Sequence, residues 1–135
     1  MVIITGASKN IGRYLFSAFK DCGEQVIGTY NSTSDGFEDD KEDYYKVDIS
    51  NHEEVKNWVA SLRGLEHITL VCCAGMSQAG YAHKADIRVW QKVVEVNLFG
   101  TFNIVHELLP IMREQTYGRI IMMSSVVATQ FLTSS

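Results

Sequence analysis

The chain alternates short apolar runs with stretches whose apolar residues recur at helical spacing, and this alternation limits the folds it can adopt. The apolar runs cover residues 1–5, 25–30, 44–49, 67–75 and 118–125, and each reads as a buried strand. Strands that alternate with helices are typical of a parallel sheet with helices on both faces. The sequence therefore predicts one α/β domain over residues 1–135, a doubly wound sheet in three α/β/α layers.

The intervening segments carry signals for helices and their ends. The first helix is expected to stop at Gly23 and to bury an apolar row of Ile11, Leu15, Ala18, Phe19 and Cys22. Ser50 followed by Glu53 predicts a capping box that opens a second helix, which ends at Gly64. Residues 86–113 are expected to form two helical segments that meet near Asn97, and Pro110 should bend or end the last turn. Their predicted buried stripe consists of Leu98, Phe102, Val105, Leu109 and Met112.

Composition excludes several classes of function. With 46% hydrophobic residues the 135-residue chain can build a core, and a net charge of −4 provides no basic surface for nucleic acid. No apolar run reaches the length of a membrane span, and no leader-like segment precedes the first strand, so we expect neither membrane insertion nor secretion. Adjacent Cys72 and Cys73 could pair only with strain, which favours reduced thiols in the cytoplasm.

Metal binding has little support in the sequence. The acidic segment 35–43 is interpreted as a solvated loop, because its acids lack the spacing of a calcium-binding loop. The four histidines show no metal-ligand spacing either, and we expect them to be surface or packing residues. We therefore predict no metal site.

The segment TGASKNIG, residues 5–12, lies between the first strand and the first helix. The free N–H groups and the positive dipole end of a helix that starts here suit a pyrophosphate. Gly6 permits a sharp turn, and Gly12 lets the helix approach the sheet closely. Asn10 has two interpretations, which are compatible: it adopts a positive φ angle, which asparagine tolerates better than most residues, and it acts as the N-cap of the helix.

Small or hydrogen-bonding residues gather where the predicted strands end. In a doubly wound sheet, ligands bind beyond the carboxyl ends of the strands. Those ends carry Thr5-Gly6, Tyr30-Asn31, Asp48, Cys73-Ala74-Gly75 and Ser124-Ser125. The sequence therefore predicts a ligand site along this edge.

Five segments in order, TGASKNIG, VDIS, CCAG, VNLFGTF and GRIIMMSS, carry a family resemblance. At this spacing the chain resembles the N-terminal part of a short-chain dehydrogenase/reductase, and is similar to 3-oxoacyl-acyl-carrier-protein reductases. It departs from the family pattern at Asn10, which replaces a glycine, and at Cys72-Cys73, which replaces two asparagines. The second change removes two side-chain amides, one of which usually ties the fourth strand to its neighbours.

The resemblance implies a Rossmann-type fold and a set of roles. The strand order should be 3-2-1-4-5, and the sheet should be incomplete at its C-terminal side. Asp48 would hold the adenine edge, and Ala74 and Gly75 would line the adenosine ribose. Asn97 would bend the long helix and position a water of the proton relay, or serve only as a kink residue. Ser125 would be the catalytic serine, with Ser124 as the competing candidate. The implied cofactor-binding residues are Gly6, Ser8, Lys9, Asn10, Ile11, Gly12, Tyr30, Asn31, Asp48, Ile49, Cys73, Ala74 and Gly75.

The implied activity is hydride transfer between a nicotinamide dinucleotide and a small-molecule carbonyl or alcohol, such as a 3-oxoacyl thioester. NADP is expected rather than NAD, because the end of the second strand has no acid to hold the ribose hydroxyls and Lys9 can reach a 2′-phosphate.

The family's Tyr-x-x-x-Lys motif is not among these 135 residues, and neither Tyr81 nor Tyr117 has a lysine four positions on. We therefore expect a truncated, divided or naturally short chain that is inactive alone; the alternative is a non-catalytic dinucleotide-binding or interaction fragment. A homo-oligomer, or a second polypeptide, should cover the open fifth strand.

Overall fold

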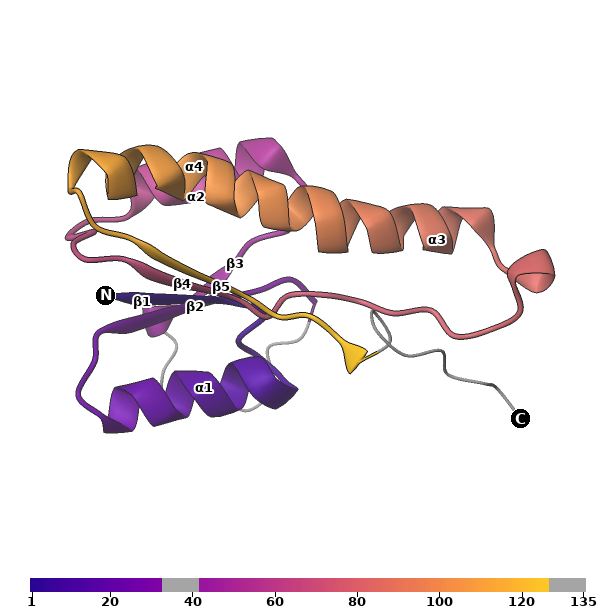
Figure 1. Cartoon of the computed structure of the whole chain (residues 1–135), viewed down its shortest axis with the longest axis horizontal. Helices are drawn as coiled ribbons and strands as arrows, with labels where there is room; N and C mark the ends of the chain where they lie inside the picture. Colours follow the sequence, from indigo (N-terminus) through magenta and orange to yellow (C-terminus); the bar gives the residue numbers. More distant parts are fainter. Residues whose placement is uncertain (33–41, 127–135) are drawn as a thin grey trace.

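A five-stranded parallel sheet forms the centre of the molecule (Figure 1). The computed structural model describes residues 1–32 and 42–126. Its strands lie in the order β3-β2-β1-β4-β5, which confirms the predicted order and the Rossmann-type architecture. All four neighbouring pairs are parallel, and Ile3 pairs with Ile27 of β2 on one side and with Leu70 of β4 on the other. The strands are β1 (Val2–Thr5), β2 (Val26–Tyr30), β3 (Tyr44–Lys46), β4 (Thr69–Cys72) and β5 (Arg119–Met122).

Helices cover both faces of the sheet, which gives the three predicted layers. α1 (Asn10–Asp21) lies on one face, and α2 (His52–Ser61) and α4 (Thr101–Glu114) lie on the other (Figure 1). A long helical rod contains α3 (Ile87–Val94), a π-helical segment η3 (Glu95–Gly100) and then α4, and the short 3-10 helix η2 (Ala82–Lys84) precedes it. The predicted junction near Asn97 is therefore a change of helical winding within one rod.

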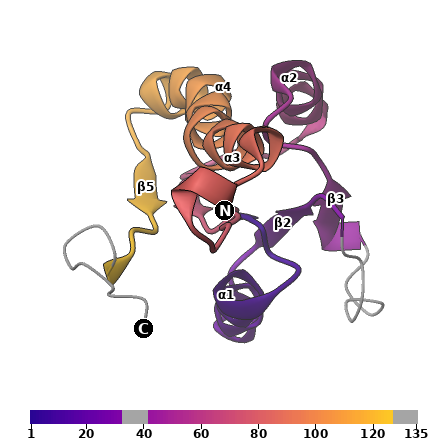
Figure 2. The ribbon, with the colours of Figure 1, turned by 90° about the vertical axis from the view of Figure 1, so that its right-hand side faces the viewer.

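The core consists of two apolar clusters, one on each face of the sheet. The smaller cluster packs Phe16 of α1 against β1, β2 and β4, and Phe16 stacks on Tyr44 with ring centroids 4.3 Å apart. The larger cluster joins the opposite face to α2 and α4 through residues such as Val55, Ile104 and Leu108. Figure 2 shows α1 beneath the sheet near β2, and β5 at the edge of the sheet away from β3.

The predicted buried rows of two helices are only partly confirmed: Leu15, Phe19 and Val105 pack partly buried against the core and Met112 is buried, but the other fully buried residues belong to a neighbouring row. In α1 the buried residues are Gly12 and Phe16, whereas Ile11 is 56% exposed and Cys22 is exposed. In the long rod Ile104, Leu108 and Met112 are buried, whereas Leu98, Phe102 and Leu109 are exposed. Each helix carries two adjacent apolar rows, and the contact with the sheet selects one of them. In α1 that choice follows from the close approach at Gly12.

Two predictions about helix ends also need correction. Asn51, rather than Ser50, caps α2, because its side chain accepts hydrogen bonds from the N–H groups of Glu53 and Glu54. Pro110 does not end the helix, because α4 continues to Glu114, one residue beyond the predicted end at Arg113; a bend at Pro110 stays a prediction.

Two further sequence predictions concern the acidic segment and the membrane. Residues 35–41 of the acidic segment lie outside the described residues. Within the described part, Asp43 forms an ion pair with Lys20, with 2.7 Å between its Oδ2 and the Lys20 Nζ. Among the helices that the structure describes, none is long and apolar enough to cross a membrane.

Candidate functional site

A cavity of about 540 Å³ opens at the carboxyl edge of the sheet. Every cofactor-binding residue predicted from the sequence lines it, except Tyr30. Side chains alternate along a strand, and Tyr30 packs into the cluster on the α1 face together with Val26. The lining residues that the sequence analysis missed are Thr29, Ser32, Val47, Met76, Lys92 and Val96.

The turn after β1 is packed too tightly for any side chain at its two glycines. Gly6 has a φ of 66°, and a Cβ there would lie 2.6 Å from the Cα of Ala74. A Cβ on Gly12 would lie 2.3 Å from the carbonyl oxygen of Gly6. These contacts place backbone, rather than side chains, at the wall of the cavity, as a phosphate-binding turn requires.

Asn10 adopts the left-handed conformation that one of its two interpretations required. Its φ is 48°, and it is the first residue of α1. The N-cap position belongs to Lys9, whose side chain makes no capping hydrogen bond. The positive-φ prediction is confirmed and the N-cap interpretation is wrong. Asparagine therefore stands here in a conformation that glycine adopts most easily.

The end of β4 is tied to β1 close to the two cysteines. The hydroxyl of Thr5, a residue only 2% exposed, accepts a hydrogen bond of 3.2 Å from the N–H of Ala74. Burial, together with the neighbouring Cys73, raises the pKa of the Cys72 thiol to about 11. Burial also raises the pKa of Cys73, which lines the cavity. Both side chains are therefore protonated thiols at neutral pH.

Asp48 is held in a polar network at the cavity wall. Its carboxylate accepts hydrogen bonds from the N–H and the hydroxyl of Ser50, at 2.9 and 2.6 Å, and lies 3.6 Å from the ammonium of Lys92. Burial raises the pKa of Asp48, but the Ser50 hydrogen bonds and the Lys92 charge outweigh it and leave the pKa below its ordinary value. Asp48 is therefore an oriented, ionised acceptor.

Lys92 lines the cavity but was not among the cofactor-binding residues predicted from the sequence. It projects from α3, and its ammonium donates a hydrogen bond of 2.8 Å to the Ser50 hydroxyl while lying 3.6 Å from Glu95. Its distance of 42 positions from Ser50 left no local pattern that could link the two. The signal available in the sequence was only a lysine one helical turn before Glu95, which is common on exposed helices.

Asn97 joins the π-helical segment to the loop after β4. Its side-chain amide donates to the carbonyl of Met76 and accepts from the N–H of Met76, both at 2.9 Å. It lines a second cavity of about 520 Å³, together with the end of β4, with Met122 and Met123, and with Leu98, Thr101, Phe102 and Val105 of the rod. Asn97 thus lies between the predicted cofactor cavity and the β5 edge of the sheet.

Ser124 and Ser125 come just after β5, with Met123 between the strand and Ser124, and both are exposed at the same carboxyl edge. Neither serine lines either of these two cavities in the part of the chain that the structure describes. The structure therefore brings Asn97 and the phosphate-type turn to one edge, and leaves the choice between Ser124 and Ser125 untested.

Comparisons with known proteins agree with this geometry. The family model described as short chain dehydrogenase matches residues 1–134. Acetoacetyl-CoA reductase of Shinella zoogloeoides is 31% identical over 132 residues, which cover 93% of this chain and 55% of that protein. The 3-oxoacyl-[acyl-carrier-protein] reductase FabG of Rickettsia prowazekii is 30% identical over 130 residues, which cover 93% and 53%.

The solved structures give the same result. Serine dehydrogenase from Escherichia coli superposes with a TM-score of 0.86 at 26% identity, covering 97% of this chain and 64% of that one. The closed form of serine dehydrogenase complexed with NADP+ also has a TM-score of 0.86, at 25% identity, with coverage of 96% and 56%. The chain spans about half the length of the curated relatives that it matches. On the family match over residues 1–134, the chain belongs to the short-chain dehydrogenase family.

Proposed function

We propose that the protein is an NADP-dependent oxidoreductase that interconverts a carbonyl and an alcohol, with 3-oxoacyl thioesters as the substrate class. The observation that carries this proposal is the cavity in which the turn after β1, Asp48 and the end of β4 meet. Relatives named acetoacetyl-CoA reductase and 3-oxoacyl-[acyl-carrier-protein] reductase support the substrate class.

The cavity fits the elongated, charged shape of a dinucleotide. Its volume lies in the range of about 300–1,000 Å³ that is usual for small-molecule and cofactor sites. The close backbone contacts at Gly6 and Gly12 leave N–H groups, rather than side chains, for a pyrophosphate. Asp48, ionised and fixed by Ser50 and Lys92, would accept a hydrogen bond from the exocyclic amine of adenine.

Cofactor selection rests on Lys9 and on the end of β2. Lys9, Asn31 and Ser32 line the cavity, and the β2 end offers amide and hydroxyl groups where an NAD-selecting site has a carboxylate. We propose that the Lys9 ammonium pairs with the 2′-phosphate of NADP. Titrating NADPH and NADH against the wild-type chain, Lys9→Ala and the control Lys56→Ala tests this. We expect NADPH affinity to fall only in Lys9→Ala; equal affinities in all three proteins would contradict the proposal.

The catalytic roles remain proposals for Asn97 and Ser125. The bound dinucleotide would supply the hydride. The Ser125 hydroxyl would donate a hydrogen bond to the carbonyl oxygen as negative charge builds there, and removal of such a donor typically costs about 3–4 kcal/mol. Asn97, fixed by Met76, would hold a water of the proton relay.

The test of function is to follow NADPH oxidation with ketones and 3-oxoacyl thioesters, using the chain alone and with a polypeptide that carries a Tyr-x-x-x-Lys segment. A positioned general acid contributes about 10²–10⁴-fold, so we expect near-background turnover alone and a gain of that order with the added segment. Loss of this gain in Ser125→Ala, but not in Ser124→Ala, would identify the serine. Dinucleotide binding without any recovered turnover would favour a non-catalytic binding function.

We also propose that the open side of the molecule is covered by further polypeptide, from a second copy or from a separate chain. Leu98, Phe102 and Met122 are each about 60% exposed, and β5 forms the edge of the described sheet. An exposed apolar edge strand promotes association. Sedimentation should therefore detect self-association; a monodisperse monomer with an accessible β5 would contradict this proposal.

We place the protein in the cytoplasm on the basis of its cysteines. Cys72 is buried and Cys73 partly buried, and such free thiols persist in reducing compartments. Cell fractionation with an antibody to the chain tests this location.

A further inference from the structure

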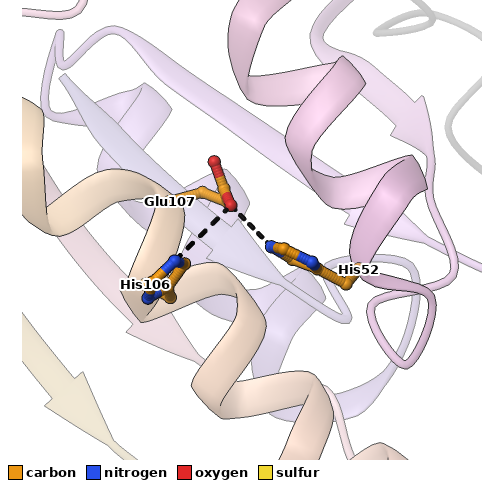
Figure 3. A group of neighbouring side chains, drawn as sticks. All are labelled: His52, His106 and Glu107. Atoms are coloured by element: carbon orange, nitrogen blue, oxygen red, sulfur yellow. Dashed lines mark hydrogen bonds and ion pairs between the residues drawn. The ribbon is translucent and has the colours of Figure 1, made fainter.

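Two of the four histidines meet a glutamate between α2 and α4 (Figure 3). His52 is the first residue of α2, and His106 and Glu107 are consecutive residues of α4. The expectation that the histidines serve only as surface or packing residues did not include this grouping. Sequence spacing could not predict it, because 54 positions separate His52 from His106.

The ligand-type atoms of these three side chains converge. The Nε2 of His52 lies 2.6 Å from Oε1 of Glu107, and the Nε2 of His106 lies 4.0 Å from the same oxygen. One atom from each residue lies within 4.8 Å of the other two. Two ligands of one tetrahedral zinc ion are about 3.3 Å apart, given zinc–nitrogen bonds of about 2.0–2.1 Å. The observed separations fall on both sides of that value, so small side-chain rotations would complete the geometry.

The chemistry of this set selects the metal. We propose that His52, His106 and Glu107 form a zinc site that links α2 to α4, with water as the fourth ligand. Two imidazoles and a carboxylate match the His₂Glu ligand set of known zinc sites, whereas magnesium and calcium prefer oxygen ligands.

The surroundings permit an ion to enter and hold it in place. The side chains of His52 and His106 are 46% and 58% exposed, so the site is open to solvent. Phe102 stacks on the His106 ring with centroids 5.6 Å apart, a contact that disfavours large movements of that ring but permits small rotations. The positive dipole end of α2 opposes a cation, but the acidic Glu53 and Glu54 in its first turn offset this field.

A bound ion would act on the part of the fold that covers one face of the sheet. The two helices contribute Val55, Ile104 and Leu108 to the larger apolar cluster. Zinc that joins their surfaces stabilises the folded state, because a metal that binds only the native protein shifts the unfolding equilibrium. This effect does not depend on the dinucleotide cavity or on the proposed oxidoreductase activity.

The test is a calorimetric titration of the purified chain with zinc chloride, with magnesium chloride as the control ion. We expect one saturable zinc site in the wild-type chain, and loss of that site in His106→Ala and in Glu107→Gln. Glu107→Gln keeps the size of the side chain and removes the charge that zinc prefers. His83→Ala and Cys22→Ser change an exposed histidine and an exposed thiol elsewhere, and both should retain the site.

Two further readouts keep the proposal falsifiable. Thermal unfolding should shift upward with zinc in the wild-type chain and stay unchanged in His106→Ala, whose fold is checked by circular dichroism. Cobalt substituted for zinc should give a tetrahedral spectrum without a thiolate charge-transfer band. The proposal is overturned if no saturable binding occurs, if His106→Ala binds like the wild type, or if the cobalt spectrum shows thiolate ligands.

Discussion

The cavity edge and the β5 edge of the same sheet differ in how far their side chains are buried and hydrogen-bonded. At the cavity edge, Thr5 and Thr29 are almost fully buried, and Asp48 and Asn97 have defined hydrogen-bond partners. On the β5 side, Ile121 and Met122 are about half exposed. The difference shows that the described residues bury or hydrogen-bond the groups at the cavity edge, whereas the apolar side chains of β5 stay exposed.

Helix α4 has both a buried side and an exposed side. Ile104 and Leu108 are fully buried against the sheet, and Phe102 and Leu109 are exposed on another side of the same helix. A substitution on each side therefore measures the contrast directly, with helix propensity held nearly constant.

The largest effect is expected from Ile104→Ala compared with Phe102→Ala. Truncation of the buried residue removes apolar contacts and leaves a cavity, and should lower the free energy of unfolding by about 2–5 kcal/mol. Phe102→Ala should change it by less than about 0.5 kcal/mol, because Phe102 is 62% exposed. Urea unfolding of the monomer at low concentration measures both values. A similar loss in the two variants would mean that Phe102 is buried in solution.

The cavity edge is tested by Gly6→Ala against Gly23→Ala. Both glycines have positive φ angles, 66° and 81°, but only Gly6 has backbone atoms where a Cβ would be placed. The conformational cost is common to both variants, so the difference reports overpacking, which typically costs about 1–3 kcal/mol. Chemical denaturation should show Gly6→Ala to be less stable by this amount. Equal stabilities would refute the tight contact with Ala74.

A smaller effect is expected at the start of α2, beside the cavity. Asn51→Ala removes the acceptor for the N–H groups of Glu53 and Glu54 and should cost about 1 kcal/mol of unfolding free energy. Asn51→Asp keeps an acceptor oxygen and should retain the stability. Thermal unfolding of the two variants separates them; an unaffected Asn51→Ala would return the capping role to Ser50.

The smallest effect concerns the pH dependence at Asp48. Its folded pKa lies below the ordinary value of 3.8, so its stabilising contribution is complete above that value and is lost as the pH falls through the lower folded pKa. Asp48→Asn should therefore lose less stability on acidification than the wild type. Unfolding free energies measured from neutral to strongly acidic pH test this. Identical acid dependence would show that the Ser50 and Lys92 contacts do not favour the charged form.

Local sequence signals predicted the elements well and their contacts less well. The strands, the glycine turn and the positive φ of Asn10 were predicted, because each depends on residues that are adjacent in the chain. Two apolar rows lie side by side on α1 and on α4, and helical spacing alone does not distinguish between them. The cap of α2 was misplaced by one residue, because Ser50 and Asn51 are both good capping residues.

The residues of the candidate site were likewise predicted only in part from the sequence. The turn, Asp48 and the end of β4 were placed on one edge because parallel strands all end there. Tyr30 does not line the cavity, because its place at a strand end did not reveal that its side chain packs on the α1 face, and its role in cofactor binding stays a prediction. Lys92 was missed because it reaches Asp48 and Ser50 from α3, far along the chain.

The sequence by itself determined the parallel α/β architecture, the site at the carboxyl edge and the left-handed residue in its turn. These features follow from hydrophobic period, chain direction and backbone sterics, which act over a few residues. Only the tertiary structure decided which helical rows are buried, how Lys92 meets Asp48, and that His52 meets Glu107. Those outcomes depend on the packing of whole elements, in which side chains far apart in the chain compete for the same space.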